Sequence, residues 1–197
     1  MKFVIVDDDA FILQLMKLVL EEAGHTVKSF ESSVQALREI PIERPDCLIS
    51  DVMMPEMDGF ELCREIRKRP DLASIKIIMC TSKSYEFDRS RAKELGADAL
   101  LILTDVPQAY IAYGTPAQTA LSRVTAGEMR AYAAQGHFKA GSMGPKVEAC
   151  LRFVDAGGES VIASLTADSS HLGHRFRCKP ITDSRQAISI GAKRSSL

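Results

Sequence analysis

The sequence predicts an α/β protein built on a doubly wound parallel sheet, and two observations favour this class. Short apolar runs at residues 3–6, 47–50 and 75–80 alternate with stretches of helical spacing. Runs that are apolar at every position are typical of strands buried on both faces, as in parallel sheets covered by helices. Right-handed crossovers then bring the carboxyl ends of these strands to one edge, where ligands of such folds bind.

The first hundred residues give the following expected elements in order: strand 3–6, helix 10–23, strand 26–30, helix 33–39, strand 47–50, helix 60–67, strand 75–80 and helix 88–95. Gly24 and Gly96 stand where a helix C-cap is expected, and Pro70 ends the third helix. Polar residues follow three of the strands: Asp7 and Asp8 after the first, Asp51 after the third, and Thr81 after the fourth.

The pattern changes from about residue 100. The expected elements are an apolar run at 100–103, a mostly helical stretch at 118–134, a glycine-rich loop at 136–144, a helix at 147–155, a strand at 161–165, a polar linker at 166–174 and a helix at 183–193. A chain of 197 residues accommodates either one large domain or two small ones.

Charge, apolar run length and cysteine spacing indicate which partners and which compartment to expect. The formal net charge is −1, which predicts no nucleic-acid partner. No apolar run approaches 18 residues and no signal peptide is visible, so we expect no membrane partner and a cytoplasmic protein. The five cysteines lack metal-site spacing, which indicates reduced thiols and agrees with that compartment.

Four motifs in the first part form a specific combination: Val4-Ile5-Val6-Asp7-Asp8, Asp51-Val52-Met53-Met54-Pro55 with Asp58-Gly59, Thr81-Ser82, and Gly96-Ala97-Asp98. With them, residues 1–99 resemble the receiver domain of bacterial two-component response regulators. The resemblance implies a flavodoxin-like fold, with a five-stranded parallel sheet in the order 2-1-3-4-5.

Receivers end with a fifth strand that contains an aromatic residue, two further residues and Lys-Pro, followed by a fifth helix. Residues 176–180, Phe-Arg-Cys-Lys-Pro, fit this description, and without residues 100–175 the chain has 121 residues, the ordinary receiver size. We therefore predict a discontinuous receiver, residues 1–99 and 176–197. A small α/β insertion at 100–175, including a linker at 166–175, would lie between helix 4 and strand 5 and project away from Asp51. In the alternative, Leu100–Leu103 forms the fifth strand and Thr104-Asp105 replaces Lys-Pro.

The inserted segment has motifs of its own: Leu101-Ile102-Leu103-Thr104-Asp105, Tyr113-Gly114-Thr115-Pro116, and Gly141-Ser142-Met143-Gly144-Pro145-Lys146. With these, residues 100–165 resemble the carboxyl-terminal part of carbamate kinases. The resemblance implies that Asp105 and Lys146 belong to a remnant nucleotide site. The part of such kinases that contains the phosphate and carbamate sites has no counterpart here.

The receiver resemblance implies a phosphoacceptor site at Asp51, which would attack a phosphoryl donor as a nucleophile. Asp7, Asp8, Asp51 and the backbone carbonyl of Met53 would hold Mg²⁺, which prefers oxygen ligands. Without the resemblance, three consecutive aspartates after a strand are typical of a helix-capping cluster.

The same resemblance assigns Lys179 to the phosphoryl oxygens, Thr81 as hydroxyl donor to the new phosphoryl group, and Phe176 as the residue that rotates in response. The implied partners are a sensor histidine kinase and a downstream protein target on the face of helix 4, strand 5 and helix 5. We expect no output domain and no enzymatic activity beyond self-phosphorylation from a donor and autodephosphorylation. The alternatives are a carbamate-kinase-like nucleotide phosphotransferase fragment and a chimera whose insert is inactive.

Overall fold

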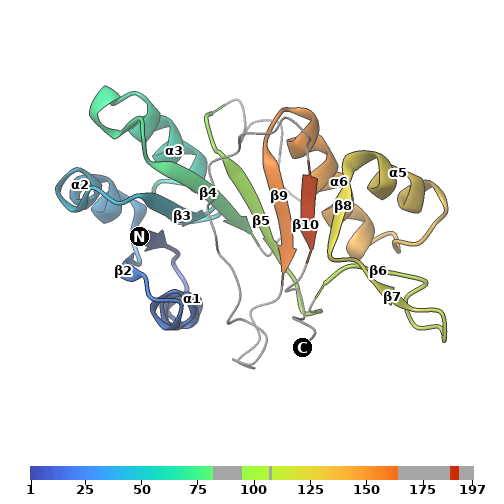
Figure 1. Ribbon diagram of the computed structural model, residues 1–197. Helices are drawn as coiled ribbons and strands as arrows, with labels where there is room; N and C mark the ends of the chain where they lie inside the picture. Colours follow the sequence, from blue (N-terminus) through green and yellow to red (C-terminus); the bar gives the residue numbers. More distant parts are fainter. Residues whose placement is uncertain (82–94, 107, 164–186, 191–197) are drawn as a thin grey trace.

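One sheet organises the chain in the computed structural model, which describes residues 1–81, 95–106, 108–163 and, for the backbone, 187–190. Within these residues the sheet has eight strands in the order β2-β1-β3-β4-β5-β9-β10-β8, and a small hairpin pairs β6 with β7 (Figure 1). The elements are β1 (Lys2–Val6), α1 (Ala10–Glu22), β2 (Thr26–Phe30), α2 (Ser33–Glu43), β3 (Cys47–Asp51), α3 (Gly59–Arg67), the 3₁₀ turn η1 (Pro70–Leu72), β4 (Lys76–Thr81), β5 (Ala99–Leu103), β6 (Tyr110–Ile111), β7 (Thr119–Ala120), β8 (Arg123–Thr125), α5 (Ala126–Ala134), α6 (Met143–Asp155), β9 (Glu159–Ala163) and β10 (Ala187–Ile190).

The strand order 2-1-3-4-5 predicted from the sequence is confirmed, and these five strands pair in parallel. Capping side chains define where the helices of this part begin. Asp9 accepts from the first amides of α1, Ser32 from Gln35 of α2, and Asp58 from Glu61 of α3. Such caps satisfy amides that have no partner within the helix, so each strand-to-helix turn has a defined geometry.

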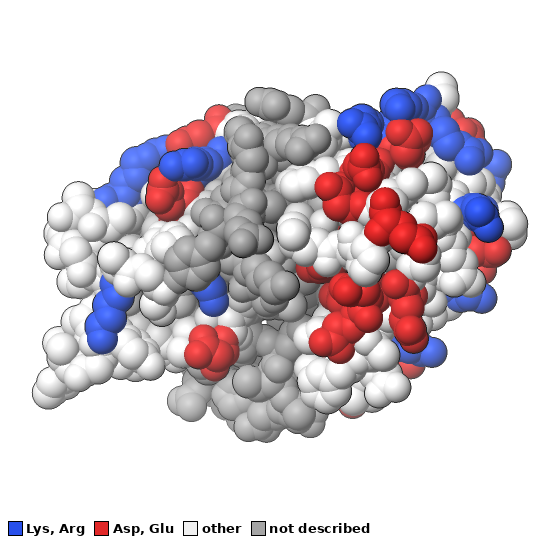
Figure 2. All heavy atoms as spheres, turned by 180° about the vertical axis from the view of Figure 1, so that it is seen from behind, with Lys and Arg blue, Asp and Glu red and all other residues white. Residues whose placement is uncertain are grey.

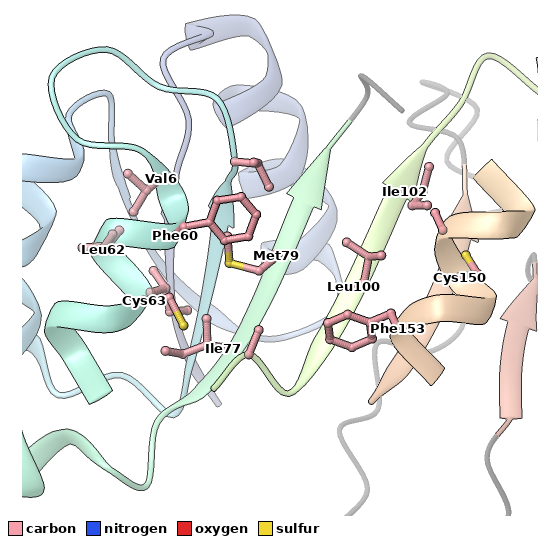
Figure 3. Packing of buried hydrophobic residues seen from close by; sticks show 14 of the residues in the cluster. Val6, Phe60, Leu62, Cys63, Ile77, Met79, Leu100, Ile102, Cys150 and Phe153 are labelled. Carbon is pink, nitrogen blue, oxygen red and sulfur yellow. The ribbon is translucent and has the colours of Figure 1, made fainter. Parts of the chain in front are cut away.

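Two apolar layers cover the sheet. Buried residues of α1 pack on one face, against β1, β3, β4 and β5. Buried residues of α2, α3, α5 and α6 pack on the other face in a single continuous cluster. Figure 3 shows this cluster running from Val6 and Phe60, past Met79 and Leu100, to Cys150 and Phe153. The first hundred residues and the following segment therefore share one hydrophobic core.

The preferred prediction for the fifth strand was wrong. Ala99–Leu103, not residues 176–180, forms the strand beside β4, with Thr81 paired to Ile102. β3 occupies the other side of β4, so both of its edges are filled. The segment that follows does not project from the opposite edge of the sheet, as expected, but extends the sheet sideways through β9, β10 and β8.

A polar network fixes the start of β5 and gives a physical reason for this result. The Arg67 guanidinium donates to the carbonyl oxygens of Gly96 and Ile75, at 2.9 Å each, and to the Asp98 carboxylate at 2.8 Å. Asp98 also accepts from the Ile77 amide at 2.9 Å and from the Lys76 ammonium at 3.1 Å. Because Ala99 follows Asp98 directly, these bonds hold the next residues in register with β4.

Further elements differ from the prediction. The stretch at 118–134 contains β7 and β8 before α5, and α6 begins at Met143, inside the expected glycine-rich loop. Ala187–Ile190 is a strand between β9 and β8 and not part of a helix at 183–193. The predicted helix 88–95 and linker 166–174 lie mainly or wholly outside the described residues. Within the described part, no helix combines the length and apolar character needed to cross a membrane.

Candidate active site at the carboxyl edge of the sheet

Three of the predicted site residues lie at the carboxyl ends of neighbouring strands. Asp7 directly follows β1, Asp51 is the last residue of β3, and Thr81 is the last residue of β4. The register pairs Val6 with Ser50 and Asp51 with Cys80, so the three positions lie at nearly the same level. The parallel sheet thus brings together residues that are 74 positions apart in the chain, between Asp7 and Thr81.

Asp7 is an unusual carboxylate because it is buried. Its side chain is only 7 % exposed, and its Oδ1 accepts from the Asp9 amide at 2.9 Å. Burial raises the pKa of Asp7 to about 6, against the lowering effect of that hydrogen bond. The negative charges of Asp51, Asp8 and Asp9 raise this pKa further. The site therefore concentrates acidic groups whose mutual repulsion a bound cation would relieve.

Asp51 is half-buried and is oriented by the loop that follows β3. The amide of Met53 donates to Asp51 Oδ2 at 2.8 Å, and the Val52 carbonyl accepts from the Gly59 amide at 3.0 Å. The Ser33 hydroxyl donates to the carbonyl of Met57 at 2.6 Å, which ties the same loop to α2. These bonds fix the backbone that surrounds the Asp51 carboxylate.

Gly59 is a site residue whose role the sequence reasoning missed. A Cβ at this position would lie 2.1 Å from the backbone carbonyl oxygen of Asp51, a distance that no side chain tolerates. Gly59 therefore lets the first turn of α3 approach the end of β3 closely. The signal was the glycine directly after the capping Asp58, at the start of a helix, because a close backbone approach is a common reason for such a glycine.

Thr81 and Cys80 complete the described part of the edge. Thr81 is buried, with 2 % of its surface exposed, and pairs with Ile102 on β5, one residue past Cys80, which pairs with Asp51 on β3. Burial and the charges of Asp51 and Asp7 raise the pKa of the Cys80 thiol well above its usual range. Cys80 is therefore an uncharged thiol close to the two carboxylates.

The oxygen donors of this edge fit the chemistry of a hard divalent cation. Carboxylates of Asp7 and Asp51 are close enough to repel each other, and Asp8 adds a third negative charge. On the face shown in Figure 2, acidic side chains gather on the half of the molecule that contains β1 to β4, at the right of the view. Among the described residues, no three His, Cys, Asp or Glu side chains are already grouped at metal-binding distances. The site thus has suitable ligands but not a closed metal cage.

The remaining predicted residues fall into two groups. Phe176 and Lys179 lie outside the described residues, and the strand position assigned to their segment belongs to β5. Asp105 and Lys146 are brought together, since the charge of Asp105 acts on the pKa of the Lys146 ammonium. That ammonium donates to the Leu103 carbonyl at the end of β5, at 3.3 Å, and its burial lowers its pKa.

Comparison with known proteins finds a match for each of the two parts of the chain. Residues 3–102 match the family model described as the response regulator receiver domain, and the match extends into β5. The chain belongs to this family. Residues 90–164 match the model of the amino acid kinase family, so a kinase-like segment adjoins the receiver and overlaps it at β5.

Two curated relatives show the same division. The chain is 37% identical over 97 residues to the alkaline phosphatase synthesis transcriptional regulatory protein PhoP of Bacillus subtilis, covering 49% of this chain and 40% of PhoP. It is 56% identical over 75 residues to the carbamate kinase of Thermococcus kodakarensis, covering 38% of this chain and 24% of that enzyme. The chain thus spans less than half the length of either relative.

A solved receiver domain also resembles the chain. It belongs to the sensor histidine kinase PA1611 of Pseudomonas aeruginosa and has a magnesium ion coordinated in its active-site cleft. The identity is 25%, the match covers 51% of this chain and 83% of that one, and the TM-score is 0.48.

Proposed function

We propose that the protein is a phosphoacceptor of a two-component signalling system and that Asp51 receives the phosphoryl group. The observation that supports this most is the juxtaposition of Asp51 with the buried, charge-perturbed Asp7 at the ends of adjacent strands. Acidic groups shifted in this way by burial and by one another are characteristic of functional sites. Family membership supports the same assignment.

In the proposed reaction, a carboxylate oxygen of Asp51 attacks the phosphorus atom of a phosphohistidine or a small acyl phosphate. The new acyl phosphate bond forms as the bond to the donor breaks, and the electron pair leaves with the donor. The Met53 amide, 2.8 Å from Asp51 Oδ2, holds the carboxylate in one orientation during this attack. A carboxylate that is already oriented loses less entropy on reaching the reactive geometry.

Asp7, Asp8, Asp51 and the Met53 carbonyl are the proposed ligands of Mg²⁺, which would neutralise charge on the transferred phosphoryl group when bound. Asp7, with its pKa raised to about 6, must be deprotonated to act as a ligand. The proposed site therefore binds the cation better as the pH rises through about 6, because the cation then meets the carboxylate form.

Thr81 is the proposed hydroxyl donor to the phosphoryl group, in keeping with its place at the end of β4 next to Asp51. Lys179 and Phe176 remain predictions, as cation and switch residue, as does the assignment of residues 176–197 to the receiver. Receiver domains as a class work with sensor histidine kinases, and a kinase of this type is the proposed donor. The proposed downstream partner is a protein that binds the face of helix 4, strand 5 and helix 5, as the receiver resemblance implies.

The test is the mass of the intact protein after incubation with Mg²⁺ and acetyl phosphate. We expect one added phosphoryl group on the parent and on Asp71→Asn, a control at an exposed aspartate in η1. Asp51→Asn should gain none. A parent protein that stays unmodified while folded, or an Asp51→Asn variant that gains the same mass, would refute the assignment.

A second candidate function concerns the kinase-like segment, where Asp105 and Lys146 act on each other electrostatically. These are the residues that the carbamate kinase resemblance assigns to a nucleotide site. Calorimetric titration with ATP and Mg²⁺ tests the candidate, with Lys146→Gln as the variant. Heat of binding that the variant lacks would support a nucleotide site, and no binding at millimolar ATP would reject it.

A further inference from the structure

Lys146 lies at the carboxyl end of strand five, and Asp51 lies at the carboxyl end of β3 in the same parallel sheet. Its ammonium donates to the carbonyl oxygen of Leu103, the last residue of β5, at 3.3 Å. It reaches this point from the first turn of α6, which packs against the sheet through Val147 and Cys150. A positive charge from the kinase-like segment is therefore held at the carboxyl end of the receiver's fifth strand.

The register of the sheet places this charge relative to Asp51. Asp51 pairs with Cys80 on β4, and Cys80 pairs in turn with Leu101 on β5. Neighbouring strands lie about 4.8 Å apart and residues along a strand about 3.3 Å apart, so Leu103 lies about 12 Å from Asp51 along the sheet. A phosphoryl group on Asp51 would extend beyond the strand end, toward the level of the Lys146 ammonium.

We propose that Lys146 is an electrostatic positioning residue for phosphorylation of Asp51. This inference rests on the proposed function and extends it. Phosphorylation replaces the single negative charge of the Asp51 carboxylate with the close to two negative charges of an acyl phosphate, at an edge that also holds Asp7 and Asp8. The Lys146 ammonium, which β4 separates from Asp51, offsets part of this charge. Because the lysine is half-buried, water screens the interaction less.

Asp105 is the titratable group that acts on Lys146 in the described structure, and it has the opposite sign. It follows β5 and offsets part of the positive charge that Lys146 presents to the edge. The two residues therefore should have opposite effects on phosphorylation of Asp51. Removal of the lysine charge should slow the reaction, and removal of the aspartate charge should speed it.

The experiment compares initial rates of Asp51 phosphorylation by acetyl phosphate, with Mg²⁺ and low salt, from intact mass. Lys146→Gln keeps a hydrogen-bond donor for Leu103 but loses the charge, and we expect a rate about threefold to tenfold lower. Lys146→Arg should restore most of the rate, and Asp105→Asn should raise it. Lys68→Gln, at an exposed lysine after α3, is the matched control and should equal the parent. The difference between parent and Lys146→Gln should shrink as salt is added.

The possible outcomes distinguish failure of the proposed function from failure of the role proposed for Lys146. A parent that is not phosphorylated contradicts the proposed function itself. A parent that is phosphorylated together with a Lys146→Gln variant of equal rate overturns the role of Lys146 alone. If both Lys146→Gln and Lys146→Arg lose the same activity, or if salt leaves their difference from the parent unchanged, Lys146 acts through packing and not through charge, which also overturns the inference.

Discussion

Substitution of Asp7 by asparagine should stabilise the protein at neutral pH in the absence of divalent cations. Asparagine keeps the shape of the side chain and an oxygen that accepts from the Asp9 amide, but it has no charge. The pKa of Asp7 is raised from 3.8 to about 6 in the folded protein. This difference corresponds to about 3 kcal/mol of unfavourable free energy once the folded carboxyl group is ionised.

The sign of the pH dependence follows from this shift. Between pH 4 and pH 6, folded Asp7 keeps a proton that the unfolded chain has lost, so the parent loses stability as the pH rises through this range. The asparagine side chain of the variant does not titrate. The free energy of unfolding of Asp7→Asn should therefore match the parent near pH 4 and exceed it by up to about 3 kcal/mol at pH 7.5.

Urea unfolding followed by far-UV circular dichroism measures this, because the chain has no tryptophan for fluorescence. Glu22→Gln, at an exposed residue of α1, controls for the change in net charge. Mg²⁺ at about a thousand times its dissociation constant should reverse the order, because it stabilises the parent by about 4.1 kcal/mol. A parent and variant with the same pH dependence, or a variant that is less stable at pH 7.5 without Mg²⁺, would refute the reasoning.

Three further substitutions test the packing around the site. Gly59→Ala should destabilise the fold by more than about 3 kcal/mol in urea unfolding, because its Cβ would meet the Asp51 carbonyl at 2.1 Å; stability within about 1 kcal/mol of the parent would contradict this. Arg67→Met should cost about 2–4 kcal/mol, because it leaves the part-buried Asp98 carboxylate without its guanidinium partner, and Lys68→Met should cost far less. Phe153→Ala should cost about 3–5 kcal/mol and lower hydrogen-exchange protection in β4 as well as in α6, since both share one core; loss confined to α6 would show two separate cores.

The sequence predicted β1 to β4 well because their signals are local. Of these, β1, β3 and β4 are mostly apolar runs of five or six residues with a polar residue at or directly after the carboxyl end, and the run length separates them from a helix. The site residues Asp7, Asp51 and Thr81 followed from the same reasoning, because the end of a parallel strand determines the edge at which a residue lies.

The fifth strand was mispredicted because two segments competed for one position and the choice depends on distant contacts. Residues 176–180 have the more specific motif, but pairing them with β4 requires closure of a long loop, at about 2–3 kcal/mol more than a short one. Ala99–Leu103 follows Asp98 directly and needs no closure. The bonds from Arg67 to Gly96 and Asp98 join residues about 30 positions apart, and no local pattern reveals them.

The contact of Lys146 with β5 could not be predicted from the sequence either, since its ammonium donates to the carbonyl oxygen of Leu103, 43 residues earlier in the chain. The first turn of α6 was not predicted as helix, because it contains Gly144 and Pro145. Proline is nevertheless tolerated in the first turn of a helix.

The central claim is that Ala99–Leu103 forms the strand beside β4. The measurement that tests it most directly is a nuclear Overhauser experiment on the isotope-labelled protein, on the side of β4 that faces β5. We expect cross-strand contacts from Met79, Cys80 and Thr81 to Leu100, Leu101 and Ile102, as their register requires. Contacts from the same β4 residues to residues 176–180 instead would place the receiver's own segment beside β4. They would contradict both the shared fifth strand and the location of Lys146 at the active edge.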